Sequence, residues 1–529
     1  MKFSRLTKIL LVSILLMALL VGCGQKGGDA GGGAGSSQPK IAYYAYNTEP
    51  YIDLDPSVEY SNGIVTLHNL YETLTRYNDK TQKVEPLLAE SWKSSDDGME
   101  WTFKLVEGIK FHDGSTLNAQ AVKKSIDRTM EMNMGAAYIW DSVKEINVID
   151  EYTVEFILDY SSPIDLIASA AYASFIMSPE AAEKDSAWFN EGNAAGTGPY
   201  TLQKVTPGEE VILAKFDDYW KGWEDNQYER VVIKKVVEST SCRQLVEKGE
   251  AQVTSNLSTT DINALRGDAN VDIIDGASWK NVIGFFNIEK APLDNADFRR
   301  ALSYAYPYEE VVTNVRENQA IQSFGIVPVG LWGHDESLHQ YSFDLDKAQE
   351  YIDKSGVDAS DLKLELTFTS GDEGHRNAAQ LYQVNLKKLG IDLEIREMNW
   401  DNVWERSKNP DPQDRQDILV MYWWPDFPSP ISWLQSLIHS EDEISFNLSY
   451  INDSELDKKI EEGDRLSATD REKSEELFRE VQDEVINKAY QIFMYDDKTI
   501  WATSKEFKGF EPNPSYEGVV FFYDTYYEE

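Results

Sequence analysis

Short runs of apolar and β-branched residues alternate along this chain with longer amphipathic segments. Four of the short runs are predicted strands, at residues 211–213, 231–233, 271–274 and 282–287. Three of the longer segments have apolar residues at helical spacing, at residues 119–130, 296–304 and 377–389. Gly390 is a typical C-cap for the last of these helices. The alternation predicts a mixed α/β protein.

Further elements follow toward the C-terminus. Residues 391–395 alternate like a strand, and residues 454–487 predict a pair of long polar helices with mixed charges on their exposed faces. Residues 417–421 predict another strand, which leads into Tyr422-Trp423-Trp424-Pro425-Asp426-Phe427-Pro428-Ser429-Pro430. Three prolines end this strand and stiffen the loop, so its side chains are expected to be held in place at a cleft.

The N-terminus has the pattern of an export signal. Lys2, Arg5 and Lys8 precede an apolar run over residues 9–22, which is short for a membrane span and suits a signal peptide. The run ends in Leu20-Val21-Gly22-Cys23, which resembles the lipobox of bacterial lipoproteins and implies a lipid on Cys23 after cleavage. The Gly-rich residues 24–38 then form a flexible tether. The sequence predicts a signal peptide at 1–22 and a lipidated linker at 23–39.

Composition and charge narrow the class of protein. Of the 529 residues, 490 follow Pro39, which is enough for two or three domains. Cys242 is the one cysteine besides Cys23, so no internal disulfide is expected. The formal net charge of −41 disfavours nucleic acid and anionic lipid headgroups, which leaves the lipid anchor as the membrane attachment. The acidity either concentrates cationic ligands near a cleft or serves solubility or adaptation to salt or high pH.

Several blocks, in order, are similar to the peptide/nickel-type family of extracytoplasmic solute-binding proteins (solute-binding protein family 5) of ABC importers. The blocks are Glu85-Pro86-Leu87-Leu88-Ala89-Glu90-Ser91-Trp92, Asp96-Asp97-Gly98-Met99-Glu100-Trp101-Thr102-Phe103, Gly108-Ile109-Lys110-Phe111-His112-Asp113-Gly114, Gly196-Thr197-Gly198-Pro199-Tyr200, Phe298-Arg299-Arg300-Ala301-Leu302 and Leu386-Lys387-Lys388-Leu389-Gly390-Ile391. Their local chemistry is that of turns and half-buried strands, so they are expected to be scaffold.

The resemblance implies an α/β, two-lobed periplasmic-binding-protein-like (type II) fold with an extra inserted domain. Lobe I is expected at 40–84, 196–290 and 496–529, the inserted domain at 85–195, and lobe II at 291–495. The lobes are expected to close over a small solute, most of all a peptide, and to deliver it to ABC permease and ATPase subunits. The resemblance implies a monomer on the extracytoplasmic face, with no cofactor and no nucleic-acid partner.

The resemblance also points to ligand-binding residues. Asp426 falls where peptide-binding relatives pair an Asp with the peptide's α-ammonium, and a desolvated carboxylate suits that group. Tyr422, Trp423 and Trp424 are expected to supply flat walls and cation–π contacts. Asn62, Trp279 and Trp400 are weaker candidates. Relatives often have an Arg upstream of the Asp for a ligand carboxylate; here that stretch is Leu419-Val420-Met421, so Arg376 is the alternative anion partner.

Other functions stay open at this point. Tryptophans near the loop would also suit an oligosaccharide receptor, since sugar faces stack on indoles. A metal-chelate receptor belongs to the same family, but the six His are scattered and no metal-site spacing occurs. No nucleophile elbow, HExxH or Gly-rich cofactor turn favours an enzyme.

Overall fold

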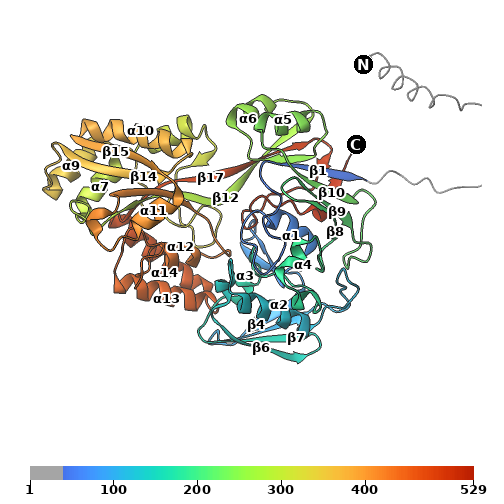
Figure 1. Cartoon of the computed structure of the whole chain (residues 1–529). Coiled ribbons are helices and arrows are strands. Elements are labelled where there is room, and N and C mark those ends of the chain that lie inside the picture. The colour runs from blue at the N-terminus through green and yellow to red at the C-terminus, as the bar shows by residue number, and fades with distance from the viewer. Residues whose placement is uncertain (1–39, 529) are drawn as a thin grey trace, which may run out of the picture. The chain divides into compact units, whose positions relative to one another are not determined.

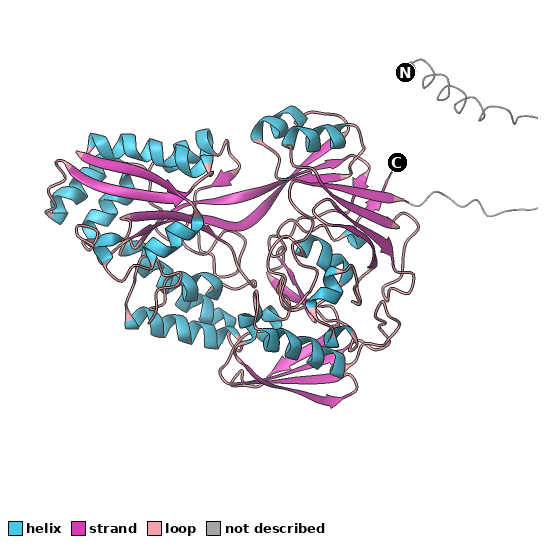
Figure 2. Cartoon of the chain, viewed as in Figure 1, coloured by secondary structure: helices cyan, strands magenta, loops and turns pink. Residues whose placement is uncertain are grey.

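The computed structural model describes residues 40–528, and one mixed sheet of eleven strands organises them (Figures 1 and 2). Ten strands follow the order β15-β14-β16-β12-β17-β11-β1-β10-β9-β8, and β13 pairs with β17. The bounds are β1 Ile41–Tyr46, β8 Tyr200–Thr206, β9 Glu210–Lys215, β10 Arg230–Lys235, β11 Val253–Ser255, β12 Val271–Phe286, β13 Ala320–Ile321, β14 Leu362–Thr369, β15 Ile391–Met398, β16 Ile418–Trp423 and β17 Gln491–Ser504.

The two longest strands, β12 and β17, join the two halves of this sheet (Figure 2). They pair antiparallel along most of their length. The second half of β12 pairs with β16, and the last part of β17 pairs with β11. The ladder slips between Ala277 and Asn281, which makes a bulge in the middle of β12. The strand that joins the two halves of the sheet is therefore irregular at this bulge.

The predicted strands at 271–274 and 282–287 are one continuous strand, which corrects the sequence prediction. The stretch between them interrupted the apolar pattern; within it Ser278, Trp279 and Asn281 are buried, whereas Asp275 and Ala277 are exposed. Asn281 is fully buried; its side-chain amide donates to the Ile326 carbonyl at 2.8 Å, and its oxygen accepts from the Trp433 indole at 3.0 Å. Tertiary hydrogen bonds thus allow polar residues inside a strand.

Helices cover the sheet and form a separate group below one half (Figure 1). The longer helices are α1 Ile64–Leu70, α2 Ala119–Met132, α5 Ser239–Glu247, α6 Thr259–Leu265, α7 Ala296–Ala305, α9 Leu345–Ser355, α10 Glu373–Lys388, α11 Trp400–Ser407, α12 Ile431–Leu437, α13 Ser454–Ser467 and α14 Arg471–Asn487. Helix α10 begins four residues before the predicted start, because the Asp372 side chain caps it by accepting from the His375 amide. Between residues 40 and 528 no helix has both the length and the apolar character needed to cross a bilayer.

A second sheet of four strands lies within the predicted inserted domain. Its order is β4-β5-β7-β6, with bounds Ala89–Ser94, Glu100–Leu105, Thr153–Leu158 and Val143–Asp150, and α2 packs on β6 and β7. The predicted turn at Asp97-Gly98 joins β4 to β5, with Gly98 at φ +70°. Shorter elements are β2 Thr75–Asn78, β3 Lys83–Pro86, α3 Ile164–Ile167, α4 Ser186–Asn190, α8 Tyr308–Glu310, β18 Phe507–Lys508 and β19 Tyr526–Tyr527.

The domain boundaries expected from the sequence stay predictions, because the described residues 40–528 form one compact unit. The boundary at 290 falls just after β12, and the boundary at 496 falls inside β17. The Gly196-Thr197-Gly198 turn packs directly on the end of α1. A Cβ added to Gly196 would lie 2.1 Å from the Leu70 carbonyl oxygen, so this turn requires glycine for close backbone approach.

A buried ion pair fastens α2 to the loop that follows β1. Arg128 donates to both Asp55 oxygens at 2.7 and 2.6 Å, and the two side chains are 8% and 0% exposed. Ser186 also donates to Asp55, at 2.7 Å. Removing one member of such a pair leaves an uncompensated buried charge. This contact connects the inserted segment to the loop that leads to Tyr60.

We expect Arg128→Met to lower the free energy of unfolding by about 3 kcal/mol or more, because Asp55 loses its buried counter-ion. The matched control is Lys123→Met on the same helix, whose partner Asp127 is part-exposed; it should cost less than about 0.5 kcal/mol. Urea unfolding followed by fluorescence measures both. Equal effects of the two variants would contradict a structural role for the Arg128–Asp55 pair.

Candidate functional site

Aromatic side chains from distant parts of the chain surround one cavity of about 530 Å³. Five of them, Tyr60, Tyr138, Trp400, Tyr422 and Trp424, keep 40% or more of their surface exposed. Large aromatic rings left exposed around one hollow are typical of a binding site. The full wall comprises Tyr60, Gly135, Ala136, Tyr138, Tyr172, Thr369, Asp372, His375, Trp400, Met421, Tyr422, Trp423, Trp424, Asp426 and Phe446.

The end of β16 and the loop after it supply the core of this wall, because the strand continues to Trp423, two residues beyond the predicted end at 421. Tyr422 and Trp424 stack with ring centroids 5.5 Å apart. Trp423 is anchored, because its indole donates to the Ser432 carbonyl at 2.8 Å and its ring packs edge-on against Phe446 at 4.8 Å. The Trp332 indole donates to the Pro428 carbonyl at 2.7 Å, farther along the same loop. The loop is therefore held in place from several sides.

Asp426 faces the cavity from this loop and accepts a hydrogen bond from the Tyr138 hydroxyl. Tyr138 belongs to a short 3₁₀ helix, Ala137–Trp140, within the inserted segment. Burial raises the pKa of Asp426 to about 6, although the bond from Tyr138 opposes this shift. Burial and the nearby Asp426 charge raise the pKa of Tyr138, so its hydroxyl stays protonated and donates. Asp426 is thus a partly desolvated carboxylate that a cationic group can stabilise.

A second corner of the wall lies at the start of α10. Asp372 caps the helix by accepting from the His375 amide at 2.8 Å, and its side chain remains 35% exposed. His375 is 5% exposed, and burial lowers its pKa. The His375 ring lies 6.4 Å from the Tyr422 ring. This corner combines a carboxylate, a neutral imidazole and an aromatic face.

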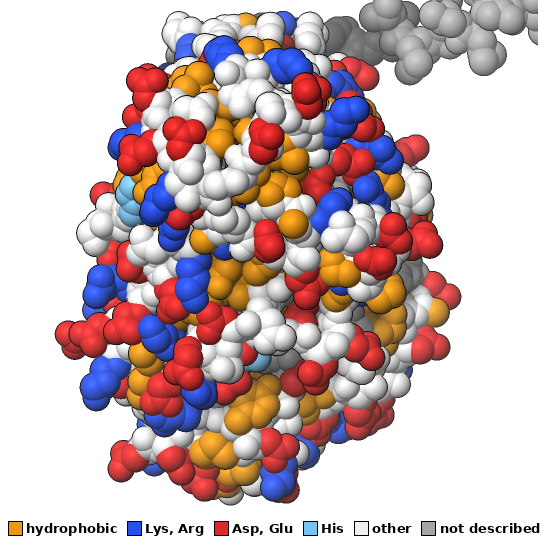
Figure 3. All heavy atoms as spheres, turned by 90° about the vertical axis from the view of Figure 1, so that its left-hand side faces the viewer, with side chains coloured by type: hydrophobic (Ala, Val, Ile, Leu, Met, Phe, Trp, Pro, Cys, Tyr) orange, Lys and Arg blue, Asp and Glu red, His pale blue; other side chains and the backbone are white. Residues whose placement is uncertain are grey.

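The charges around the cavity are uneven. No Lys or Arg occurs among the described residues that line it. Lys280 lies over the Tyr422 ring at 5.2 Å, but Asp497 binds it at 3.3 Å and also binds Arg316 at 2.7 Å. Figure 3 shows acidic side chains scattered between basic ones over one face of the molecule. In the described chain no group of three or more His, Cys, Asp or Glu is placed to hold a metal ion.

The structure brings five of the candidate residues together in the wall: Tyr422, Trp423, Trp424, Asp426 and Trp400. Three others lie elsewhere. The Asn62 amide donates to Thr48 at 2.7 Å, outside the wall. Trp279 is 1% exposed and packs against Tyr77, because the bulge in β12 turns it into the core. Arg376 pairs with Glu397 at 2.5 and 2.8 Å and does not line the cavity.

Sequence reasoning missed Tyr60, Tyr138, Tyr172, Asp372 and His375. Tyr60 lies two residues before Asn62, in the loop that was expected to reach the ligand. Asp372 and His375 stand in the polar segment before Arg376, where they had the pattern of a helix start. No local pattern marks Tyr138 or Tyr172, because only the packing of the inserted segment brings them to this cavity.

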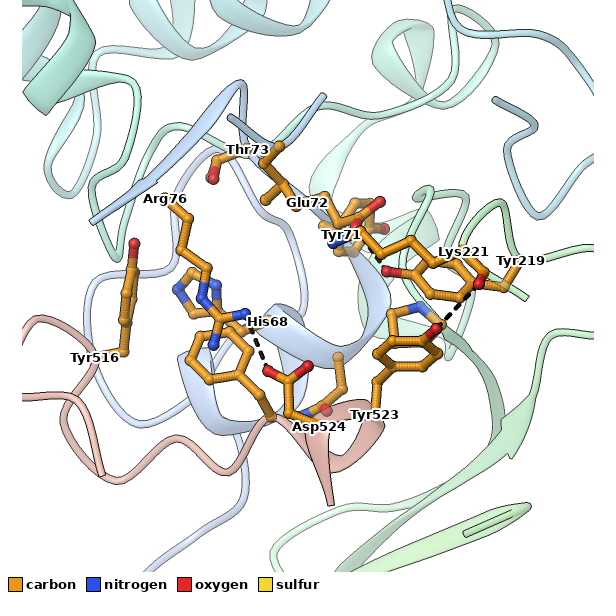
Figure 4. A pocket seen from close by; sticks show the side chains of 14 residues that line it. His68, Tyr71, Glu72, Thr73, Arg76, Tyr219, Lys221, Tyr516, Tyr523 and Asp524 are labelled. Atoms are coloured by element: carbon orange, nitrogen blue, oxygen red, sulfur yellow. Dashed lines mark hydrogen bonds and ion pairs between the residues drawn. The ribbon is translucent and has the colours of Figure 1, made fainter. Parts of the chain in front are cut away.

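A different hollow, shown in Figure 4, lies beside α1 and is much smaller, about 40 Å³. Its charged groups bind each other: Arg76 pairs with Asp524 at 3.1 Å, and Glu72 accepts from Tyr219 at 2.9 Å and from Trp220 at 3.0 Å. Burial raises the pKa of Glu72. The hollow has room for a few waters only, so we do not assign it a ligand.

Comparison with solved structures identifies the class of protein. The chain resembles HbpA2 from Haemophilus parasuis, with a TM-score of 0.82 at 21% identity over 92% of this chain and 100% of that one. It also resembles the oligopeptide-binding protein AppA from Bacillus subtilis in complex with a nonapeptide, with a TM-score of 0.70 at 19% identity over 93% and 100%. These likenesses confirm the predicted α/β periplasmic-binding-protein fold with an additional sheet domain.

Sequence comparison identifies the family. The model for bacterial extracellular solute-binding proteins, family 5 Middle, matches residues 83–444. The chain is 31% identical over 476 residues to the "Probable D,D-dipeptide-binding periplasmic protein DdpA" of Escherichia coli K12, which covers 88% of this chain and 90% of that protein. The chain therefore belongs to the family 5 extracellular solute-binding proteins, the non-enzymatic substrate-binding subunits of ABC transporters.

The raised pKa of Asp426 makes a prediction about stability. Its folded pKa of about 6 exceeds the ordinary value of 3.8 for an aspartate, so the folded state holds the proton more tightly. The stability that protonation supplies is therefore present at low pH and is lost as the pH rises from about 4 to about 6. Asp426→Asn cannot titrate, so we expect wild type to lose free energy of unfolding relative to this variant across that window.

Urea unfolding at pH 4.5 to 8 measures this difference. Asp464 and Asp496 also have pKa values raised to about 7, but both are present in each protein and cancel in the comparison. Asp358→Asn is the control, because hydrogen bonds from Ser360 lower the Asp358 pKa from its ordinary value of 3.8, so its titration falls below the measured range and predicts no loss of stability there. A pH-independent difference for Asp426→Asn would show that this carboxyl is not desolvated.

Proposed function

We propose that this protein captures a peptide whose primary ammonium binds Asp426, and that it delivers the peptide to an ABC permease and its ATPase. The observation that carries this proposal is the desolvated Asp426 carboxylate in an aromatic wall without any Lys or Arg among its described residues. An ammonium would replace or join the Tyr138 hydroxyl on Asp426 through charge-assisted hydrogen bonds. Tyr422 and Trp424 would provide ring faces for side chains and for the cation.

The relatives support a peptide as the ligand. DdpA is described by its name as D,D-dipeptide-binding, and AppA of Bacillus subtilis holds a nonapeptide in its structure. A dipeptide-binding protein of Escherichia coli K12 is 24% identical over 84% of this chain. The ligands named for these proteins differ in length. A cavity of about 530 Å³ accommodates a short peptide more readily than a nonapeptide.

Contacts across the cavity favour closure of two lobes around the ligand. Tyr138 and Asp165 come from the inserted segment, whereas Asp426 and Arg471 come from the predicted lobe II. Tyr138 donates to Asp426, and an Arg471 nitrogen contacts both Asp165 oxygens at 2.8 Å. The strands β12 and β17 join the halves and would act as the hinge. A ligand that binds the closed arrangement more tightly shifts the equilibrium toward it.

The attachment to the membrane is part of the same proposal. Cys23 lies outside the described residues, and the lipobox-like segment before it supports a lipid anchor with the linker at 23–39 as a tether. The protein would work as a monomer on the extracytoplasmic face. A docked permease would then collect the ligand from a receptor that is confined to the membrane surface.

Native mass spectrometry of the protein mixed with a library of di- to pentapeptides would select a binding peptide, and calorimetry would then test Asp426. We expect Asp426→Asn to weaken that peptide about 30-fold at pH 7.5, because a charge-assisted hydrogen bond to the ammonium is lost. N-acetylation of the peptide should weaken wild-type binding similarly and add little to the variant. Asp358→Asn serves as the control. Unchanged affinity of Asp426→Asn would remove this residue from the site.

The lipid anchor makes a separate prediction. In the native bacterium, wild-type protein should sediment with membranes and incorporate a labelled fatty acid. Cys23→Ser should abolish the labelling, because serine has no thiol to acylate. Cys242→Ser, a change at a buried thiol in α5, should leave the labelling intact. Full labelling of Cys23→Ser would disprove the anchor.

A further inference from the structure

A second carboxylate, Asp372, lines the cavity in addition to Asp426. One Asp372 oxygen accepts the helix-capping hydrogen bond from the His375 amide at 2.8 Å. The other oxygen lies 3.4 Å from Nδ1 of His375. The Asp372 side chain stays 35% exposed, so its charge is accessible to a group inside the cavity.

His375, beside Asp372, points to a missing partner. It is 5% exposed and lines the same wall, yet its Nδ1 makes no hydrogen bond with any described residue. A buried polar atom without a partner costs free energy, so such atoms are rare in folded proteins. Burial lowers the His375 pKa and keeps the ring neutral, and a neutral ring can accept a hydrogen bond. A ligand N–H group would satisfy it.

The surroundings of this corner suit a cation. The Tyr422 ring lies 6.4 Å from the His375 ring, and Trp400 lines the same wall. The cations closest to this corner, Lys280 and Arg316, both bind Asp497 at 3.3 and 2.7 Å. No Lys or Arg lines the described part of the wall, and Arg316, whose charge also interacts with Asp372, is bound to Asp497. A positive group on the ligand would meet a carboxylate, an imidazole acceptor and aromatic faces together.

We infer that the ligand carries a second positive group, which binds at the Asp372–His375 corner while its α-ammonium binds Asp426. This inference rests on the proposed function and narrows it to basic peptides, with a Lys or Arg side chain. The whole chain has a formal net charge of −41, which attracts such ligands from a distance and speeds their association.

Asp372→Asn tests this inference. Asn caps helices as well as Asp does, so the start of α10 should be retained. The peptides that wild type retains from a random di- to pentapeptide library should be enriched in Lys and Arg, and the variant should lose this enrichment. For a matched pair in which Lys of the best binder is replaced by norleucine, we expect wild type to prefer the Lys peptide about tenfold or more by calorimetry. In Asp372→Asn that preference should fall below about twofold.

Asp344→Asn is the matched control. Asp344 caps α9 by accepting from the Lys347 amide at 2.9 Å and lies outside the cavity wall, so it removes the same charge from another helix start. It should keep the wild-type preference, which excludes a general effect of net charge. Wild type that binds library peptides without favouring basic ones overturns this inference and leaves the proposed function standing. If no peptide in the library binds, both the proposed function and this inference are contradicted.

Discussion

The antiparallel pairing of β12 with β17 is the constraint on which the rest of the described structure depends. The two strands pair along most of their length; β12 also pairs with β16, and β17 also pairs with β11 and β13. The bulge between Ala277 and Asn281 interrupts this ladder close to the cavity, and it sends Trp279 into the core while Lys280 lies over Tyr422. A bulge increases the local twist and re-aims side chains, so this irregularity places Lys280 over Tyr422, and under the proposed function it would lie at the hinge between the halves.

The site itself depends on charges that the protein keeps away from water. Desolvation raises the pKa of Asp426, and in the absence of a ligand only the Tyr138 hydroxyl compensates its charge. The Asp372 carboxylate also has few partners. It accepts the helix-capping hydrogen bond from the His375 amide, and burial lowers the pKa of the His375 ring beside it. Both nearby cations are bound to Asp497. Under the proposed function the cavity favours a positive ligand, whose binding would offset the unfavourable desolvation of these carboxylates.

The position of Asp426 within a transporter subunit also follows from this arrangement. Asp426 is on the loop after β16, while Tyr138 is on the inserted segment, so one hydrogen bond joins parts of the chain that are almost 300 residues apart. A ligand that takes over this bond contacts both parts at once. Under the proposed function, binding and closure would be coupled, and a permease would recognise the closed, loaded receptor by its shape.

Local patterns in the sequence by themselves predicted much of the secondary structure and the fold of this protein. Strand and helix periodicity placed β9, β10, α2 and α7 within two residues of their observed bounds, and β15 within three, because these elements bury one regular apolar face. The proline-rich loop after β16 was recognised with Trp423, Trp424 and Asp426, since prolines and aromatic residues together are unusual there. The ordered family motifs indicated the fold, which the solved structures confirm.

Only the tertiary structure determined the continuity of β12 and which residues line the cavity. Periodicity divided β12 in two because it cannot show that Asn281 has buried partners at Ile326 and Trp433. Trp279 and Arg376 were plausible ligand contacts by type, but packing buries the first and Glu397 pairs with the second. Tyr138 and Tyr172 carry no local signal, and they reach the cavity through the docking of the inserted segment. Sequence patterns report the environment of a residue along its own element, whereas a binding site is made by residues that only folding brings together.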